Sequence, residues 1–91
     1  MFMIGKWEDR SEGERIIKIL IDSTHQNTAT DVKKYILEQV YNDNATVDEM
    51  GKYRLSTKDF YPFFTNPPVT IKSKTKDGTK IYYEIFEMKG A

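Results

Sequence analysis

The sequence predicts an α+β fold in which one helix packs on a β-sheet. Three stretches lead to this prediction. Five of the six residues in Ile16–Ile21 are isoleucine or leucine, and β-branched side chains favour a strand. An amphipathic helical pattern follows in Thr28–Asn44. Val69–Met88 then alternates apolar and polar residues on either side of a turn at Asp77-Gly78, as the two strands of a hairpin do.

The first hairpin is expected to join strands Phe2–Arg10 and Arg15–Asp22 through the loop Ser11-Glu12-Gly13, with the glycine in a left-handed conformation. Opposite charges and apolar residues then face each other across the strands, in the pairs Arg10–Glu14, Asp9–Arg15, Trp7–Ile17 and Met3–Ile21. One face of the second strand is wholly apolar and should line the core, namely Ile17, Ile19 and Ile21. The other face is mixed and should be covered only in part: Ile16, Lys18, Leu20 and Asp22.

The helix is expected to begin after Thr28, whose hydroxyl can cap it, with Asp31 in the first turn beside the exposed N–H groups. An apolar stripe at helical spacing should face the sheet, made of Val32, Tyr35, Ile36, Leu37 and Val40. The helix should end within Tyr41–Asn44, because Asn-Asp-Asn suits a left-handed cap.

After the helix, Lys52–Thr57 alternates and is expected to form a short third strand, with Tyr53 and Leu55 directed inward. An aromatic cluster and a pair of prolines follow in Phe60–Phe64 and Asn66–Pro68. We expect these aromatic side chains to close the open end of the core. The alternative is an exposed aromatic patch that binds a partner.

The register of the second hairpin follows from the loop Lys76-Asp77-Gly78. With this loop, one face of the hairpin is apolar and the other polar, as in a half-buried antiparallel pair. The apolar pairs are Val69–Ile85, Ile71–Tyr83 and Ser73–Ile81, and the polar pairs are Thr70–Glu84 and Lys72–Tyr82. A two-residue loop would mix the two faces, so the three-residue loop is preferred.

Length and composition indicate one domain spanning residues 1–91. The chain has no cysteine, and its 14 basic and 14 acidic residues give a formal net charge of +0. No global field therefore attracts nucleic acid or membranes. No apolar run is long enough to span a bilayer, and the N-terminus lacks the features of a signal peptide. We expect a soluble cytoplasmic protein that has no membrane partner.

The sequence contains no recognisable catalytic or cofactor motif. His25 is the only histidine, and without cysteine there is no Cys–His pair and no usual zinc ligand set. The five glycines are isolated, so no phosphate-binding loop exists. We therefore expect neither an enzyme, nor a metal site, nor a cofactor.

The expected order of hairpin, helix, short strand and hairpin is that of the ubiquitin-like β-grasp fold. In that fold, the first and last strands lie parallel at the centre of a mixed sheet. The stretch Arg15-Ile-Ile-Lys-Ile-Leu-Ile-Asp-Ser-Thr, followed by Thr-Ala-Thr-Asp-Val32 and the helix, resembles the corresponding part of Ras-association domains. The resemblance covers roughly Lys6–Leu55, about half of the chain.

The resemblance implies a signalling module that binds a small GTPase in its GTP-loaded state. Such domains pair their second strand with a strand of the GTPase, and basic residues meet its acidic switch region. Carried over to this chain, the partner-binding residues would be Lys6, Arg15, Lys18, Lys33 and Lys34. The first interpretation is therefore non-catalytic protein binding by strand addition at a sheet edge.

Two alternatives stay open. The chain could be a small free-standing protein, encoded by a virus or a mobile element, that binds and inhibits a host protein. It could instead bind single-stranded nucleic acid through the last hairpin, where basic residues surround an aromatic ring: Lys72, Lys74, Lys80 and Tyr82. A lysine-rich hairpin can equally be a solvated surface that discourages edge pairing, and the zero net charge favours that interpretation.

Overall fold

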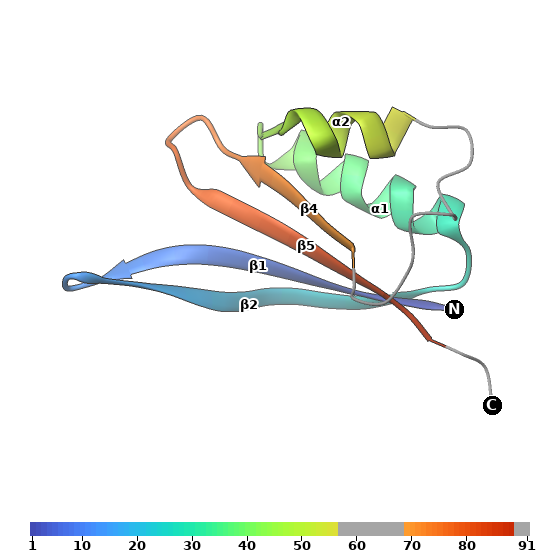
Figure 1. Cartoon of the computed structure of the whole chain (residues 1–91), viewed down its shortest axis with the longest axis horizontal. Helices are drawn as coiled ribbons and strands as arrows, with labels where there is room; N and C mark the ends of the chain where they lie inside the picture. The colour runs from blue at the N-terminus through green and yellow to red at the C-terminus, as the bar shows by residue number, and fades with distance from the viewer. Residues whose placement is uncertain (57–68, 89–91) are drawn as a thin grey trace.

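The computed structural model describes residues 1–56 and 69–88. Two helices, α1 and α2, lie on one side of a five-stranded sheet whose strand order is β2-β1-β5-β4-β3 (Figure 1). The elements in chain order are β1 (Phe2–Glu12), β2 (Arg15–Gln26), α1 (Ala29–Asn42), β3 (Thr46–Val47), α2 (Glu49–Ser56), β4 (Val69–Lys74) and β5 (Lys80–Glu87). The predicted α+β class is confirmed. The aromatic cluster Phe60–Phe64 and the prolines after it lie outside the described residues.

The core lies between the helices and the nearer face of the sheet. Val32 and Ile36 of α1 are fully buried, as are Ile4 of β1, Ile71 of β4 and Tyr83 of β5. Burying an isoleucine or valine side chain contributes about 1.5–3 kcal/mol, so this apolar layer supplies most of the stabilisation. The remaining core residues are Phe2, Leu55, Val69, Ile81 and Ile85.

Every neighbouring pair of strands in the sheet is antiparallel, so the expected mixed sheet with a parallel central pair is wrong. β1 and β5 do lie side by side at the centre, from Phe2 opposite Glu87 to Glu8 opposite Ile81. Successive elements run back and forth across the sheet, and β5 returns opposite to β1 (Figure 1). The β4–β5 hairpin makes β5 antiparallel to β4, so the direction of β5 relative to β1 is set by the direction in which the chain enters β4.

The expected short strand at Lys52–Thr57 is also wrong, because Glu49–Ser56 forms α2, a second helix. Its start is set by Asp48, whose Oδ1 accepts a hydrogen bond of 2.7 Å from the backbone N–H of Gly51. Leu55 is buried as predicted, but Tyr53 is 59% exposed. A stretch as short as Lys52–Thr57 fits the alternation of a strand and the spacing of a helix equally well. In the helix, the buried residues Gly51 and Leu55 are four positions apart and share one face. The short strand β3 lies earlier, at Thr46–Val47.

The register of the first hairpin differs from the expected one. The turn consists of two residues, Gly13 and Glu14, and Gly13 has a φ of 62°. A left-handed glycine at the first of two central turn positions favours this tighter loop. Opposite charges still meet, as Glu12 with Arg15 and Asp9 with Lys18, so charge matching could not choose between the two registers. A bulge between Lys6 and Trp7 shifts the pairing further along.

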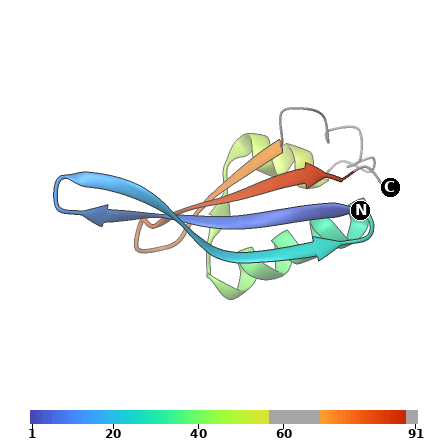
Figure 2. The same ribbon diagram turned by 90° about the horizontal axis from the view of Figure 1, so that it is seen from below.

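The β1–β2 hairpin extends beyond the helices, and β2 is an edge strand (Figures 1 and 2). The apolar face expected to line the core is therefore covered only in part. Ile17 and Ile19 are half-buried, and Ile21 is 38% exposed. The composition of β2 predicted a strand correctly. Its burial depends on how far the helices reach, which its own sequence does not determine.

The predictions for α1 and the second hairpin are largely confirmed. The Thr28 hydroxyl accepts a hydrogen bond from the Asp31 N–H at 3.1 Å, and Asn44 ends the helical region at a φ of 50°. Leu37 is the exception in the apolar stripe, since it is 45% exposed. Every predicted cross-strand pair of the second hairpin is present, including Ile71–Tyr83 and Lys72–Tyr82.

Candidate functional site

Lys6, the first of the five basic residues implied by the resemblance, is a structural residue. Its side chain is 7% exposed, and its Nζ lies 2.7 Å from Oδ2 of Asp43. The same ammonium donates a hydrogen bond of 2.9 Å to Oε1 of Gln39 and lies 6.0 Å from the ring centre of Tyr83. An ammonium held in this way ties β1 to the end of α1. A side chain that is buried and paired in this way offers little surface to a partner, so the structure does not support the predicted role of Lys6.

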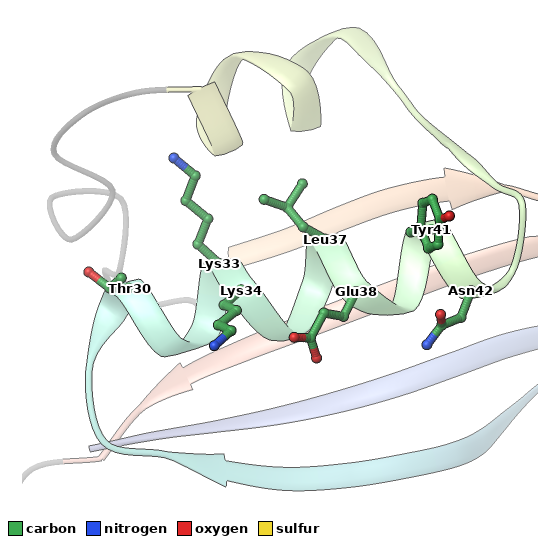
Figure 3. A pocket seen from close by; sticks show the side chains of 7 residues that line it. All are labelled: Thr30, Lys33, Lys34, Leu37, Glu38, Tyr41 and Asn42. Carbon is green, nitrogen blue, oxygen red and sulfur yellow. The ribbon is translucent and has the colours of Figure 1, made fainter.

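The other four basic residues do not form one surface. Arg15 lies beside the turn of the β1–β2 hairpin, and Lys18 lies on the sheet face opposite the helices. Lys33 and Lys34 lie on α1, on the helical side of the sheet. Figure 3 shows them along a shallow hollow of about 660 Å³ whose described lining also includes Thr30, Leu37, Glu38, Tyr41 and Asn42. A partner strand paired with β2 would therefore not contact Arg15 at the hairpin tip and the two lysines on α1 at the same time.

The four residues proposed from the last hairpin, by contrast, lie together. Lys72, Lys74, Lys80 and Tyr82 line one hollow of about 360 Å³ beside β3. The confirmed register explains this grouping, because it sets Lys72 opposite Tyr82 and Lys74 opposite Lys80. All four alternate with buried residues, so they lie on the face of the sheet that points away from the helices.

We call this uncovered face the open face. It also carries residues that the sequence analysis did not group with the last hairpin: Trp7, Asp9, Lys18 and Leu20. Trp7 lies opposite Tyr82 on one side and opposite Leu20 on the other. Seen from below, the strands lie in front of the helices (Figure 2). Trp7 follows Lys6 directly, so the two side chains point to opposite faces of the sheet. This alternation could have placed Trp7 on the open face, but only once β1 was known to lie beside β5.

Tyr82 is the centre of the contacts on the open face. Its hydroxyl donates a hydrogen bond of 2.8 Å to Oδ2 of Asp9, and Nζ of Lys18 lies 4.1 Å from its ring centre. The hydrogen bond to the Asp9 carboxylate, together with partial burial, raises the pKa of the Tyr82 phenol above its ordinary value of 10.0. The phenol therefore stays protonated, and its ring holds a lysine ammonium by a cation–π contact.

The second notable feature is the free edge of the sheet. Among residues 1–56 and 69–88, β2 pairs with β1 on one side only, over the twelve residues Arg15–Gln26. Large apolar side chains are exposed along it: Ile16 at 72%, Leu20 at 48% and Ile21 at 38%. An edge strand presents unpaired backbone N–H and C=O groups, and apolar side chains beside them favour pairing with another strand.

Two other kinds of feature are absent from the described residues. Within residues 1–56 and 69–88, no group of three or more His, Cys, Asp or Glu side chains is arranged to hold a metal ion. Over the same ranges, no helix combines the length and apolarity required to cross a membrane.

Over the part of the chain that the structure describes, these features define an α+β protein with an open sheet face and a long free edge at β2. No protein-family model matches the chain, and neither a curated protein nor a solved structure matches it. The functional argument therefore rests on the two surfaces themselves.

Proposed function

We propose that the protein is a non-catalytic binding module that takes up a β-strand of a partner protein at the free edge of β2. The observation that carries this proposal is the unpaired edge, twelve residues long, with exposed apolar side chains. In strand addition, backbone hydrogen bonds supply much of the affinity and alternate side chains supply specificity. Both components are present along β2.

The half of β2 nearest the turn is best suited to accept a strand. Counted from the two-residue turn, hydrogen-bonded and non-bonded pairs alternate along an antiparallel hairpin. Arg15 belongs to the first bonded pair, so the N–H groups of Ile16, Lys18 and Leu20 point away from β1. An incoming strand would meet these three donors before the bulge at Ile21 disturbs the ladder.

The proposal does not name a small GTPase as the partner. That expectation rests on the resemblance alone, and it gains no support from a buried Lys6 or from lysines on the helical side. The ubiquitin-like assignment is likewise not carried forward, since its central strands are parallel and here they are antiparallel. An inhibitor of another protein could use the same edge.

The test uses a phage library of random extended peptides selected on the immobilised protein. Selected peptides should alternate apolar residues, and hydrogen exchange should slow at the amides of Ile16, Lys18 and Leu20 when they bind. An Ile16→Pro variant removes one outward N–H without breaking a bond to β1, so it should abolish binding. The matched control is Tyr41→Ser, which changes a residue that is 82% exposed on α1. Failure to enrich any peptide, or equal binding to both variants, would reject strand addition.

A further inference from the structure

We propose that the open face binds single-stranded nucleic acid, with bases stacked on Trp7 and Tyr82 and phosphates held by four lysines: Lys18, Lys72, Lys74 and Lys80. This inference is independent of strand addition at β2. It concerns a different surface, and it rests on the cross-strand register, the spacing of the charges and the position of Gly5.

Trp7 and Tyr82 form what we call the aromatic platform. They lie directly opposite each other on β1 and β5, and both are half-buried. Side chains in such positions have Cβ atoms about 4.5–5.5 Å apart, so the two rings are neighbours on the face. Ring faces at the surface of a sheet accept stacked bases whatever the sequence, because every base has a π-face. The Lys18 ammonium lies over the Tyr82 ring, so a base that stacks on this ring takes the place of the ammonium, which is then available to a phosphate.

Gly5 allows the Trp7 indole to lie close to the sheet. A Cβ at Gly5 would lie 2.9 Å from Nε1 and 3.6 Å from Cδ1 of Trp7, so the indole lies over the backbone of Gly5. Real Cβ atoms essentially never approach another atom so closely. Any other residue would therefore push the indole away from the sheet. The close approach of the Trp7 indole to Gly5 depends on glycine at this site.

The lysines around the aromatic platform are poorly neutralised by the protein. Lys74 lies directly opposite Lys80, and like charges in that position are destabilising. Within the described ranges, none of the four lysines makes an ion pair. Two acidic residues lie on the same face: Asp9, which accepts the Tyr82 hydroxyl and lies opposite Lys18, and Glu84. The described lining of the hollow contains three lysines and one carboxylate, that of Asp48, so the hollow keeps a local excess of cations that a phosphate backbone would neutralise.

A single strand fits this arrangement better than a duplex. In a duplex the bases are stacked on one another, so their faces are not free to lie on Trp7 and Tyr82. The hollow lined by Lys72, Lys74 and Lys80 lies beside Tyr82, so the phosphates of a strand crossing the platform would reach these lysines. Because the whole chain has a net charge of +0, the affinity must come from this face.

The experiment titrates the protein with fluorescein-labelled oligothymidine and oligouridine of about twelve nucleotides, a length within the range bound by single-strand modules. If four phosphates are contacted, the slope of log K against log salt should be roughly −3. Trp7 is the only tryptophan, so stacking should also quench the intrinsic tryptophan fluorescence. Inorganic polyphosphate serves as a probe that carries charge without bases.

Three variants separate the parts of the proposal. Trp7→Leu keeps an apolar side chain but removes the ring, and it should weaken binding roughly 5- to 150-fold. Lys72→Glu with Lys74→Glu should weaken binding strongly and flatten the salt dependence of the binding that remains. The matched control is Lys33→Glu with Lys34→Glu on α1, which makes the same change in net charge and should leave affinity nearly unchanged. If Trp7→Leu does not fold, Tyr82→Leu replaces it.

The contrary outcomes are clear. Equal affinity for polyphosphate, or no effect of Trp7→Leu, would reject base stacking, and equal loss in the α1 control would reject the location. Binding of the selected β2 peptides to the open face, displacing the oligonucleotide, would assign this face to a protein instead. Ile16→Pro should bind oligonucleotide normally, so the failure of strand addition and the failure of this proposal are distinguishable.

Discussion

Asp43→Ala should destabilise the protein far more than its surface position suggests, because it leaves the buried ammonium of Lys6 without its ion-pair partner. The Lys6 side chain is 7% exposed and that of Asp43 is 27% exposed. Removing one partner of a fully buried ion pair costs about 3–5 kcal/mol. The partial exposure of Asp43 and the remaining hydrogen bond to Gln39 reduce this, so we expect about 2–3 kcal/mol.

Lys6→Met should cost less, about 1 kcal/mol, because it fills the same space and leaves a carboxylate that water can reach. The double variant Lys6→Met with Asp43→Ala should then cost less than the sum of the two changes, with a coupling energy of about 1–2 kcal/mol. Urea denaturation, followed by Trp7 fluorescence, measures the free energy of unfolding of the four proteins in this double-mutant cycle: the unchanged protein, the two single variants and the double variant. If both single changes cost under about 0.5 kcal/mol, as ordinary surface substitutions do, Lys6 is not buried as described and could still meet a partner.

Three further predictions concern stability. Gly51→Ala should cost about 1–3 kcal/mol by thermal denaturation, because a Cβ there would overlap Cγ1 of Val47, and little effect would place α2 differently. Thr28→Ala should cost about 1 kcal/mol through loss of the helix cap, with rescue by Thr28→Ser; no rescue would contradict capping. Burial raises the pKa of Tyr35 and of Tyr83 above the ordinary 10.0. The stabilisation of the fold by these neutral phenols is therefore complete below a pH equal to that ordinary value, and it is lost as the pH rises through the folded-state pKa. Urea midpoints should thus fall between about pH 9 and about pH 11, and fall less in Tyr35→Phe; equal falls would contradict the raised pKa.

Local features of the fold were predictable from sequence where one register or one residue conformation fitted the sequence clearly better than the alternatives. The second hairpin is the best example, since only one register separates an apolar from a polar face, and the structure has that register. The cap at Thr28 and the left-handed Asn44 were predictable for the same reason, because few residue types suit those positions. In the first hairpin two registers both pair opposite charges, so charge pairing predicts the three-residue loop no less than the two-residue turn that the structure has.

The candidate surfaces were predictable only in part, because they depend on which strands become neighbours. Lys72 and Tyr82 belong to one hairpin, so sequence alone could group them. Trp7 and Tyr82 are 75 positions apart and meet only because β1 pairs with β5. The burial of Lys6 has the same origin, since Asp43 and Gln39 reach it only when α1 covers β1. Basic residues on a strand do not reveal which face will be covered.

The two edges of the sheet differ in a way that bears on where a partner strand can bind. β3 has only two residues, and very short edge strands offer little to an incoming strand. β2 carries a bulge at Ile21 and a charged Asp22 beyond it, and both features discourage pairing in its second half. The half from Arg15 to Leu20 has no bulge, and its two charged residues are Arg15 and Lys18. Since Ile16 is also the most exposed isoleucine there, any strand addition should begin at the hairpin tip and stop before Ile21.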